Sequence, residues 1–244
     1  MMVLWAEPEE NRMRAEDVEE MRGLSLFAGV DPVHIDAVLQ ASFLQRFPGG
    51  VELLREGDRA DFLHVVVEGQ VEVFSTYRER ETTIAVYGPG QSFIVAAVLL
   101  DRVYLKSART LSSARVLMIP AAAVHRVFAA DAAFARALAQ ELAVAYRDVA
   151  KELKNQKLRS SLERLANWLL AQNEAAGGKG HFPLPFEKKV LASRLGMAPE
   201  VLSRSFASLT AYNVIVRGRD VEIRDIEALR TLAKPTPTID DPTV

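Results

Sequence analysis

The chain has 244 residues, 49% of them hydrophobic, and its 30 lysines and arginines nearly balance its 32 aspartates and glutamates. This length and composition favour two modest domains, each able to bury a core. Because the sequence contains no cysteine, disulfides, thiolate-bound iron–sulfur clusters, cysteine-rich zinc sites and thiol nucleophiles are excluded.

Both ends of the sequence are expected to lie outside the folded domains. Residues 1–23 lack the basic and apolar regions of a signal peptide, so we expect a polar leader that is frayed or loosely helical, with structure starting near Leu24. The tail, residues 233–244, is rich in proline, threonine and aspartate and is expected to be disordered. The longest apolar run, residues 93–100, is far too short to cross a bilayer. We therefore expect a soluble cytoplasmic protein with no membrane partner.

Residues 24–128 combine a helix with several short strands. Asp31 and Pro32 predict a helix start, with Asp as N-cap and Pro in the first position, and Ile35, Val38 and Leu39 form its buried side. After Phe47 the apolar period changes to two, with glycine-containing turns between the runs. We predict strands at residues 51–54, 62–67, 70–74, 82–86 and 114–119. Such strands are typical of a small barrel or β-roll.

Residues 129–158 predict one long helix with an apolar stripe that recurs about every 3.5 residues. This stripe, named here the dimer seam, consists of Phe134, Leu138, Leu142, Ala145, Val149 and Leu153. A period of this kind indicates a helix that pairs with its own copy, and Ala145 permits close approach. The alternative is a helix packed on its own barrel.

Residues 159–232 predict a helix-turn-helix, after a hinge at residues 157–161 and a helix at residues 162–170. Val190, Leu191 and Leu195 give the first helix of the motif a buried stripe, which ends at Gly196, a residue that tolerates a left-handed turn. Pro199 suits the first turn of the second helix. The buried face of that helix consists of Leu202, Phe206 and Leu209.

The exposed face of this second helix carries Glu200, Ser203 and Arg204 near its N-terminus. A carboxylate can accept from cytosine and a guanidinium can donate twice to guanine, so these residues suit base readout in a DNA major groove. Any two amphipathic helices joined by glycine would look similar, so the neighbouring features matter.

Two neighbouring features favour DNA. Residues 213–223 alternate apolar and polar side chains around Gly218, which predicts a hairpin with Arg217 and Arg219 at its tip. Residues 151–219 hold 12 lysines and arginines against 5 acidic residues, although the whole chain has a net charge of −2. A basic third in an otherwise acidic chain fits a surface that faces phosphate.

Two motifs in this order carry a family resemblance. The first is Glu56-Gly-Asp followed by Leu63-His-Val-Val-Val-Glu-Gly-Gln-Val-Glu-Val73, and the second is Pro199-Glu-Val-Leu-Ser-Arg204. Over residues 24–232 the chain resembles the Crp/Fnr family of bacterial transcription factors, and its second motif looks like that of the Fnr branch. The resemblance implies an α+β fold: a cyclic-nucleotide-binding-type β-roll (24–128), a dimerisation helix (129–158) and a winged helix-turn-helix (159–232).

The same resemblance implies a homodimer that binds a twofold-symmetric operator in double-stranded DNA, with RNA polymerase as a further partner. It places Glu200, Ser203 and Arg204 at base-contacting positions and points to a TTGAT-like half-site. Phosphate contacts are then expected from Lys188, Lys189, Arg217 and Arg219.

The resemblance does not extend to the residues that hold cyclic AMP. The family's Gly-Glu and Arg-Ser pairs fall near Ile94-Val95 and Tyr104-Leu105, where no carboxylate or guanidinium stands; Arg102, Lys106 or Arg109 could substitute as cations. We therefore expect a signal other than cyclic AMP, in an apolar pocket formed by Phe93, Val95, Val98, Leu99, Tyr104 and Leu105. A packed core without a ligand is the alternative.

Haem is one candidate cofactor for sensing an apolar or gaseous signal, and the sequence identifies no other cofactor. The four histidines, His34, His64, His125 and His181, show no paired metal spacing, and Met13, Met118 and Tyr104 are equally unforced as axial ligands. No metal site is predicted.

Other classes of function receive less support from the sequence. No phosphate-binding glycine loop, nucleophile elbow or two-histidine metal pattern is present, so we predict no catalytic residues and no enzyme. Two alternatives stay open: a regulator that responds to a cyclic nucleotide, and a winged helix that serves as a protein–protein adaptor.

Overall fold

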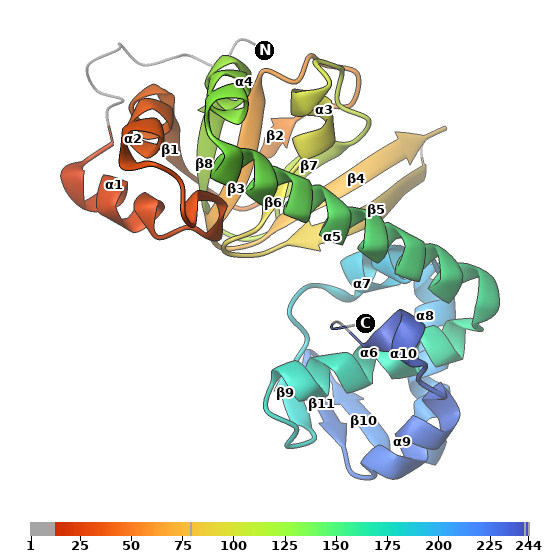
Figure 1. The fold of residues 1–244 in the computed structure, drawn as a ribbon. Coiled ribbons are helices and arrows are strands. Elements are labelled where there is room, and N and C mark those ends of the chain that lie inside the picture. The colour runs from red at the N-terminus through yellow and green to blue at the C-terminus, as the bar shows by residue number, and fades with distance from the viewer. Residues whose placement is uncertain (1–12, 79, 242, 244) are drawn as a thin grey trace. The chain divides into compact units, whose positions relative to one another are not determined.

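The computed structural model describes residues 13–78, 80–241 and 243, and these form two compact units. Unit 1 comprises the chain up to Tyr77 together with Ile84–Val144, and unit 2 comprises Arg78–Thr83 and Ala145–Val244. Unit 1 is a β-roll with helices, and unit 2 is a winged helix-turn-helix, so the predicted fold class is confirmed (Figure 1).

Unit 1 contains two four-stranded antiparallel sheets in the part of the chain that the structure describes. One has the order β1-β8-β3-β6, with bounds Phe43–Phe47, Ala114–Pro120, Phe62–Glu68 and Ser92–Phe93. The other has the order β2-β7-β4-β5, with bounds Glu52–Leu54, Ser107–Thr110, Val71–Tyr77 and Arg80–Tyr87. Facing apolar residues such as Leu63 and Ile119, or Val65 and Leu117, pair across β3 and β8 and form the centre of the core.

The five predicted strands are present, as β2, β3, β4, β5 and β8, whereas β1, β6 and β7 were not predicted. Strand β7 has the sequence Ser-Ala-Arg-Thr, without a large apolar side chain, yet Ser107, Ala108 and Thr110 are buried. Its pairing with β2 and β4 holds it in the sheet, which a local apolar pattern cannot indicate.

The leader was predicted to be frayed or loosely helical, with structure starting near Leu24; in the structure, residues 15–22 form helix α1 (Ala15–Arg22), which belongs to unit 1. Arg115 of β8 forms ion pairs with Asp17 at 2.7 Å and Glu20 at 3.0 Å, and Met21 is fully buried. These partners lie about a hundred positions apart in the sequence, so the local composition does not reveal them. Residues 1–12 lie outside the described part.

The other helices of unit 1 cover the β-roll. They are η1 (Ser25–Phe27), α2 (Pro32–Ala41), α3 (Val95–Leu99) and α4 (Ala121–Ala130). As predicted, the Asp31 side chain caps α2 by accepting from Val33 N at 2.9 Å, and Ile35, Val38 and Leu39 are buried.

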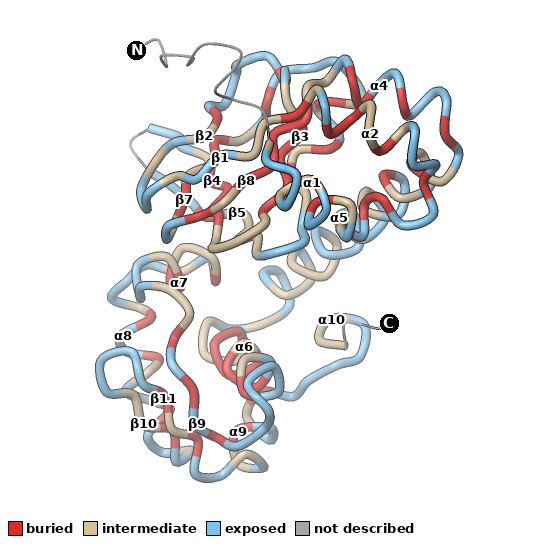
Figure 2. Tube along the Cα trace, turned by 90° about the vertical axis from the view of Figure 1, so that its left-hand side faces the viewer, coloured by how far each residue is buried: buried red, intermediate tan, exposed pale blue. Residues whose placement is uncertain are grey.

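Helix α5 (Ala132–Leu158) divides the dimer seam into two parts. Phe134 and Leu138 are fully buried in the core of unit 1, and Leu142 packs against that core, so the alternative interpretation holds for this half. Ala145, Val149 and Leu153 are exposed instead. Figure 2 shows buried positions, in red, inside each of the two units. The long period alone could not separate the two uses, because a core contact and a self-pairing contact repeat with the same spacing.

Unit 2 has its own core, separate from that of unit 1. Its helices are α6 (Ser161–Ala175), α7 (Lys188–Arg194), α8 (Pro199–Leu209), η2 (Thr210–Tyr212), α9 (Ile226–Ala233) and α10 (Pro237–Asp240). Its sheet has the order β10-β11-β9, with bounds Val214–Arg217, Asp220–Ile223 and His181–Pro183. At the predicted hinge the helix is interrupted: α5 ends at Leu158, and Ser160 caps α6 in a capping box with Glu163.

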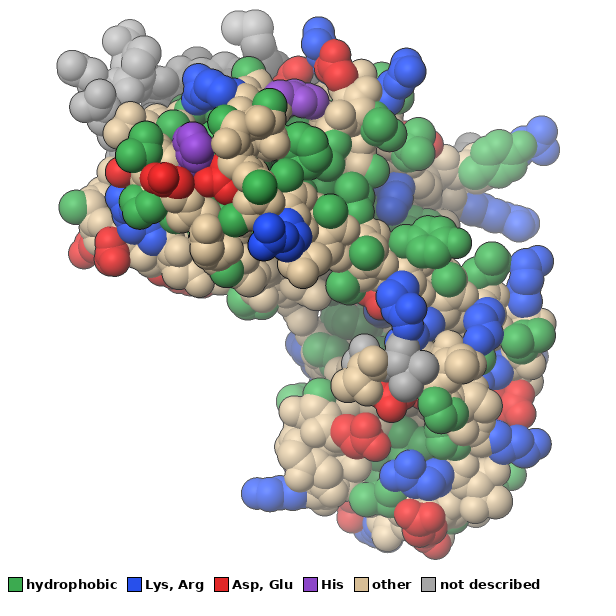
Figure 3. All heavy atoms as spheres, in the orientation of Figure 1, with side chains coloured by type: hydrophobic (Ala, Val, Ile, Leu, Met, Phe, Trp, Pro, Cys, Tyr) green, Lys and Arg blue, Asp and Glu red, His purple; other side chains and the backbone are tan. Residues whose placement is uncertain are grey.

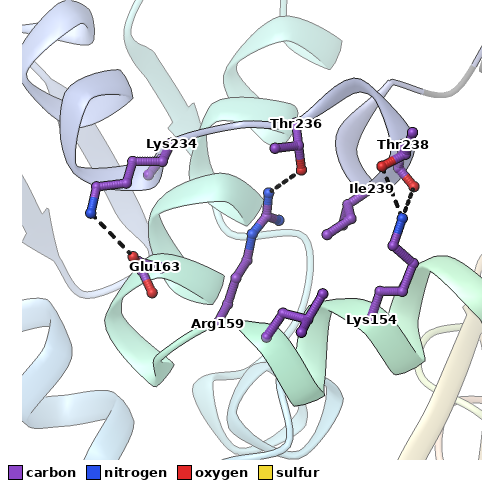
Figure 4. Close-up of a pocket in the computed structure, with 9 residues that line it drawn as sticks. Lys154, Arg159, Glu163, Lys234, Thr236, Thr238 and Ile239 are labelled. Carbon is purple, nitrogen blue, oxygen red and sulfur yellow. Dashed lines mark hydrogen bonds and ion pairs between the residues drawn. The ribbon is translucent and has the colours of Figure 1, made fainter.

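The prediction of a disordered tail was wrong, because residues 235–241 lie against α5 and include α10. Figure 4 shows this strap: Lys154 of α5 and Arg159, which directly follows α5, point toward Thr238 and Thr236 of the tail, around a cavity of about 390 Å³. Arg159 also forms a bidentate ion pair with Asp240 at 2.7 and 2.5 Å. These partners come from a distant helix, so the tail composition could not predict them.

None of the helices in the described ranges is both long and apolar enough to cross a membrane.

Candidate nucleic-acid interface

The turn between α7 and α8 has the geometry that the sequence predicts. Gly196 has φ of 61°, the left-handed conformation, and its N–H donates to Ser193 O at 3.0 Å. Pro199 occupies the first turn of α8. Leu191, Leu195 and Leu202 are buried beneath the turn, which fixes the direction in which α8 leaves it.

The predicted base-contacting side chains lie together on the outer face of α8. Glu200, Ser203 and Arg204 are all exposed, and among the described residues none forms a hydrogen bond or ion pair with these three side chains. Leu202 and Leu209 on the other face are buried, and Phe206 is partly buried. The arrangement leaves a carboxylate, a hydroxyl and a guanidinium available in the first two turns, which is what major-groove readout requires.

All four predicted phosphate contacts are exposed cations, on α7 and on the hairpin formed by β10 and β11. Lys188 and Lys189 begin α7, and the Lys188 ammonium lies 5.5 Å from the centre of the Phe206 ring. This cation–π contact holds Lys188 against α8. Arg217 lies at the tip of the hairpin formed by β10 and β11, next to the two-residue turn at Gly218 and Arg219.

Arg219, the fourth predicted phosphate contact, has an internal role. Its Nε and Nη2 donate to Leu184 O at 3.2 and 2.7 Å, and Leu184 N donates to Arg219 O at 2.7 Å. These bonds tie the hairpin tip to the segment that precedes α7. Arg219 therefore holds the hairpin tip against Leu184, and a phosphate would have to compete with the Leu184 carbonyl for its guanidinium.

Charge on unit 2 is mixed in the view of Figure 3, with blue and red side chains interspersed. The basic excess comes from its sequence, with 12 lysines and arginines against 5 acidic residues in residues 151–219. Cations at Lys188, Lys189, Arg204 and Arg217 all belong to the helix-turn-helix and its wing, so part of this excess lies on the elements that would meet DNA.

The predicted effector pocket of unit 1 is part of its core. Phe93, Val95, Val98 and Tyr104 are buried in the main cluster and Leu99 is half-buried, while Leu105 is exposed and cannot line a pocket. Ile94, which precedes α3, has φ of 67°. A β-branched residue in this left-handed region is strained, and such strain is found at ligand sites and switches.

Of the three cations considered as substitutes near this region, Lys106 has the most distinctive environment. Arg109 is committed to an ion pair with the buried Glu72 at 2.7 Å, and Arg102 is exposed. Burial lowers the pKa of Lys106, and the next residue, Ser107, accepts a hydrogen bond from Glu56 N at 2.9 Å. Among these three cations, Lys106 with Ser107 comes closest to the Arg-Ser pair that the family resemblance implies for binding phosphate.

His64 stands out from the other histidines, although no sequence pattern distinguishes it. Its side chain on β3 is 2% exposed, and its Nδ1 has no hydrogen-bond partner among the described residues. It stacks on Phe93 with ring centres 5.2 Å apart, with Phe62 and Tyr104 edge-on. Burial lowers its pKa to about 4, so the imidazole is neutral at pH 7.

The described residues as packed do not fit haem. An axial bond to His64 would require displacement of the aromatic rings around it, and His34 Nδ1 is hydrogen-bonded to an Asp131 carboxylate oxygen at 2.9 Å. His125 and His181 are exposed. Within the described residues, no group of three or more His, Asp or Glu side chains could hold a metal ion.

Two families match successive parts of the chain. Residues 44–131 match the cyclic nucleotide-binding domain, and residues 163–232 match the Crp-like helix-turn-helix domain. The cyclic AMP receptor protein of Thermus thermophilus is 28% identical over 218 residues, which cover 87% of this chain and 98% of that protein.

Solved structures agree with these matches. A candidate cAMP-binding regulatory protein from Silicibacter pomeroyi is 27% identical, with a TM-score of 0.59 over 89% of this chain and 100% of that one. FixK2 from Bradyrhizobium japonicum is 20% identical and shares the fold, with a TM-score of 0.70 over 80% of this chain and 98% of its own.

Proposed function

Because the chain belongs to the Crp/Fnr family of DNA-binding transcription regulators, we propose that it acts as a homodimer that binds a twofold-symmetric operator under control of its β-roll. The observation that carries this proposal is the exposed first part of α8, where Glu200, Ser203 and Arg204 lie without side-chain partners among the described residues. Binding to chromosomal DNA places the action in the cytoplasm, with RNA polymerase as the partner downstream.

Each group on α8 has a distinct role in the proposal. Arg204 donates to a guanine edge, Glu200 accepts from a cytosine N4 amine, and Ser203 contacts a neighbouring base. Lys188, Lys189 and Arg217 contact phosphates and set the register without reading sequence. The operator is two TTGAT-like half-sites related by a twofold axis, as the Fnr-like motif at residues 199–204 implies.

The second half of the dimer seam supports self-association. Val149 is 60% exposed and Leu153 is 54% exposed, and Tyr146, which lies beside them on the same face of α5, is 76% exposed. A helix rarely leaves such a stripe in water, and a second copy of the same stripe would bury it. The pairing would set the distance between the two copies of α8, which must match one helical turn of DNA, roughly 34 Å.

We propose that the signal is not cyclic AMP but an apolar or gaseous effector that acts on the β-roll core. Ile94 and Val95 offer no carboxylate for a ribose hydroxyl, and the surrounding residues are apolar. A cyclic nucleotide is the second candidate, because Lys106 with Ser107 could face a phosphate and the curated relative is a cyclic AMP receptor protein. A shift of the thermal midpoint on addition of cyclic AMP or cyclic GMP would decide for the second candidate.

Selection of bound sequences from random DNA tests the main proposal. We expect enrichment of a symmetric motif with half-sites one helical turn apart, bound with a steep negative dependence of log K on log salt. Failure to enrich any motif, with a flat salt dependence, would favour the protein–protein adaptor instead.

A further inference from the structure

Arg164 on α6 is a buried cation that contacts three backbone carbonyls. The residue is only 8% exposed, and its Nε donates to Leu195 O at 2.9 Å. Its Nη1 donates to Arg159 O at 2.8 Å, and its Nη2 donates to Gly196 O at 3.4 Å. One guanidinium therefore reaches both the end of α5 and the turn before α8.

Two of these carbonyls stand at helix C-caps, and Gly196 O lies one residue beyond. Helix α5 ends at Leu158 and α7 ends at Arg194, so Arg159 O, Leu195 O and Gly196 O follow directly after two helix C-termini. Helix C-termini carry partial negative charge and bind cations favourably. Arg164 thereby satisfies the ends of two helices at once, and the carbonyls offset the cost of burying its charge.

A second contact joins the same two places. A Cβ atom built on Gly196 would lie 3.5 Å from the Gln156 side-chain amide, so the last turn of α5 also lies directly against the turn. Gly196 occupies the left-handed region, which glycine adopts without steric cost, so the turn can lie this close to Gln156. A displacement of the end of α5 would therefore move the turn with it.

We infer that Arg164 is a positioning residue that fastens the turn before α8 to the end of α5 and so fixes the orientation of the recognition helix. The inference rests on the proposed function, in which α5 sets the distance between two copies of α8. Arg164 itself does not contact DNA. It acts by holding Leu195 and Gly196 at a fixed place relative to Arg159.

The test compares operators whose two half-sites are separated by different spacings. We use Arg164→Gln and Arg164→Lys, and measure affinity by fluorescence anisotropy for the selected operator, for operators lengthened or shortened by one and two base pairs, and for a single half-site. A lysine keeps the charge but reaches fewer of the three carbonyls, because it lacks the planar fork of arginine. Both variants should bind the optimal operator about tenfold more weakly than wild type, with a flattened spacing preference.

The single half-site separates positioning from loss of fold. It needs no fixed distance between the two copies of α8, so its affinity should stay within about twofold of wild type in both variants. Circular dichroism confirms that each variant is folded, and if Arg164→Gln is not, Arg164→Lys alone decides. The matched control is Arg230→Gln, an arginine of α9 in the same unit that contacts acidic side chains at the surface, and its spacing profile should equal that of wild type.

Two results would overturn the inference. One is an unchanged spacing preference in folded Arg164→Lys, and the other is an equal loss of affinity for the single half-site and the operator. If wild type itself shows no spacing preference for any DNA, the proposed function fails.

Discussion

The two units of this chain differ in the burial of the residues that are predicted to contact a ligand. In unit 2 the residues that would contact a ligand, Glu200, Ser203 and Arg204, lie exposed on a helix supported by a buried core. In unit 1 most residues predicted to contact a signal, Phe93 and Tyr104 among them, lie inside the core. A preformed surface can bind DNA without rearrangement, whereas a signal that reaches a packed core must displace part of it.

In the proposed control of DNA binding by the β-roll, this difference would give the two units different roles. A ligand changes an equilibrium only by the difference in its affinity for two states. Entry into the packed core of unit 1 would favour a repacked state, whereas DNA binds whichever state presents α8 at the correct spacing. Helix α5 belongs to both units. Its residues Phe134 and Leu138 lie in the core of unit 1, and its part from Ala145 onward belongs to unit 2. In unit 2, the carbonyl of Arg159, the residue that follows α5, accepts a hydrogen bond from Arg164.

The largest expected effect comes from the exposed half of the dimer seam. Leu153→Glu places two like charges at an apolar contact between copies, so we expect dimerisation to weaken by at least about 100-fold and operator affinity to fall with it. Analytical ultracentrifugation measures the dimer dissociation constant. Arg147→Glu is the control, because residue 147 points about 120° away from Leu153 around the helix. If the Leu153→Glu protein remained dimeric, the proposed pairing of two copies through the dimer seam would be refuted.

The next effect tests the core around His64. The pKa of His64 is about 4 in the folded chain, against 6.5 for a histidine in an unfolded chain. At pH values between these two, His64 is mostly protonated in the unfolded chain and mostly neutral in the folded chain. Protons therefore stabilise the unfolded chain: the free energy of unfolding is unaffected by His64 above pH 6.5 and decreases as the pH falls toward 4, by at most about 3 kcal/mol.

Urea titrations between pH 4 and 7 measure this loss. His64→Phe should flatten the fall of the unfolding free energy over that range, since an aromatic ring fits among the neighbouring rings without titrating. His125→Gln, which removes an exposed histidine of the same unit, serves as the control variant. Parallel curves for wild type and His64→Phe would show that His64 is accessible to protons in the folded state.

A smaller effect is expected from the strap that the tail forms on α5. Deletion of residues 235–244 removes the ion pair between Arg159 and Asp240, and we expect unit 2 to lose about 1–2 kcal/mol of stability. Hydrogen exchange at residues 151–160 should rise in the deletion and, to a lesser degree, in Asp240→Asn. Thr243→Ala serves as the control in the same tail. Unchanged exchange in the deletion would mean that the strap is not populated in solution.

The smallest effect separates phosphate contacts from base contacts. Lys188→Gln and Arg217→Gln should each reduce the slope of log K against log salt by about one, with similar losses of affinity for every DNA sequence. Arg219→Gln should alter the slope less, because its guanidinium is held by Leu184. An equal change of slope in all three variants would contradict that distinction.

The sequence predicted those parts whose pattern is local. The stripe of Leu191 and Leu195, the turn at Gly196 and the hairpin around Gly218 each depend on neighbours a few positions away, and the structure contains all of them. The exposed face of α8 follows from the same periodicity, since the residues between the buried ones must face outward.

The parts that the sequence did not reveal depend on distant partners. Helix α1 is held by Arg115, the tail by Arg159, and the turn before α8 by Arg164. Three arginines in a charged chain look like surface residues until the fold brings carboxylates or carbonyl groups to them. No local signal marked Arg164, because at helical spacing it points about 160° away from Leu162 and Ala166, so a helical pattern places it on the polar side.

The most direct test of the central claim is the base preference of Arg204→Ala. Selection from random DNA with wild type should give a symmetric motif, and the variant should lose preference at one base pair in each half-site, with an affinity loss of about 1–3 kcal/mol. An identical motif at unchanged affinity would contradict the claim that the exposed face of α8 reads the operator.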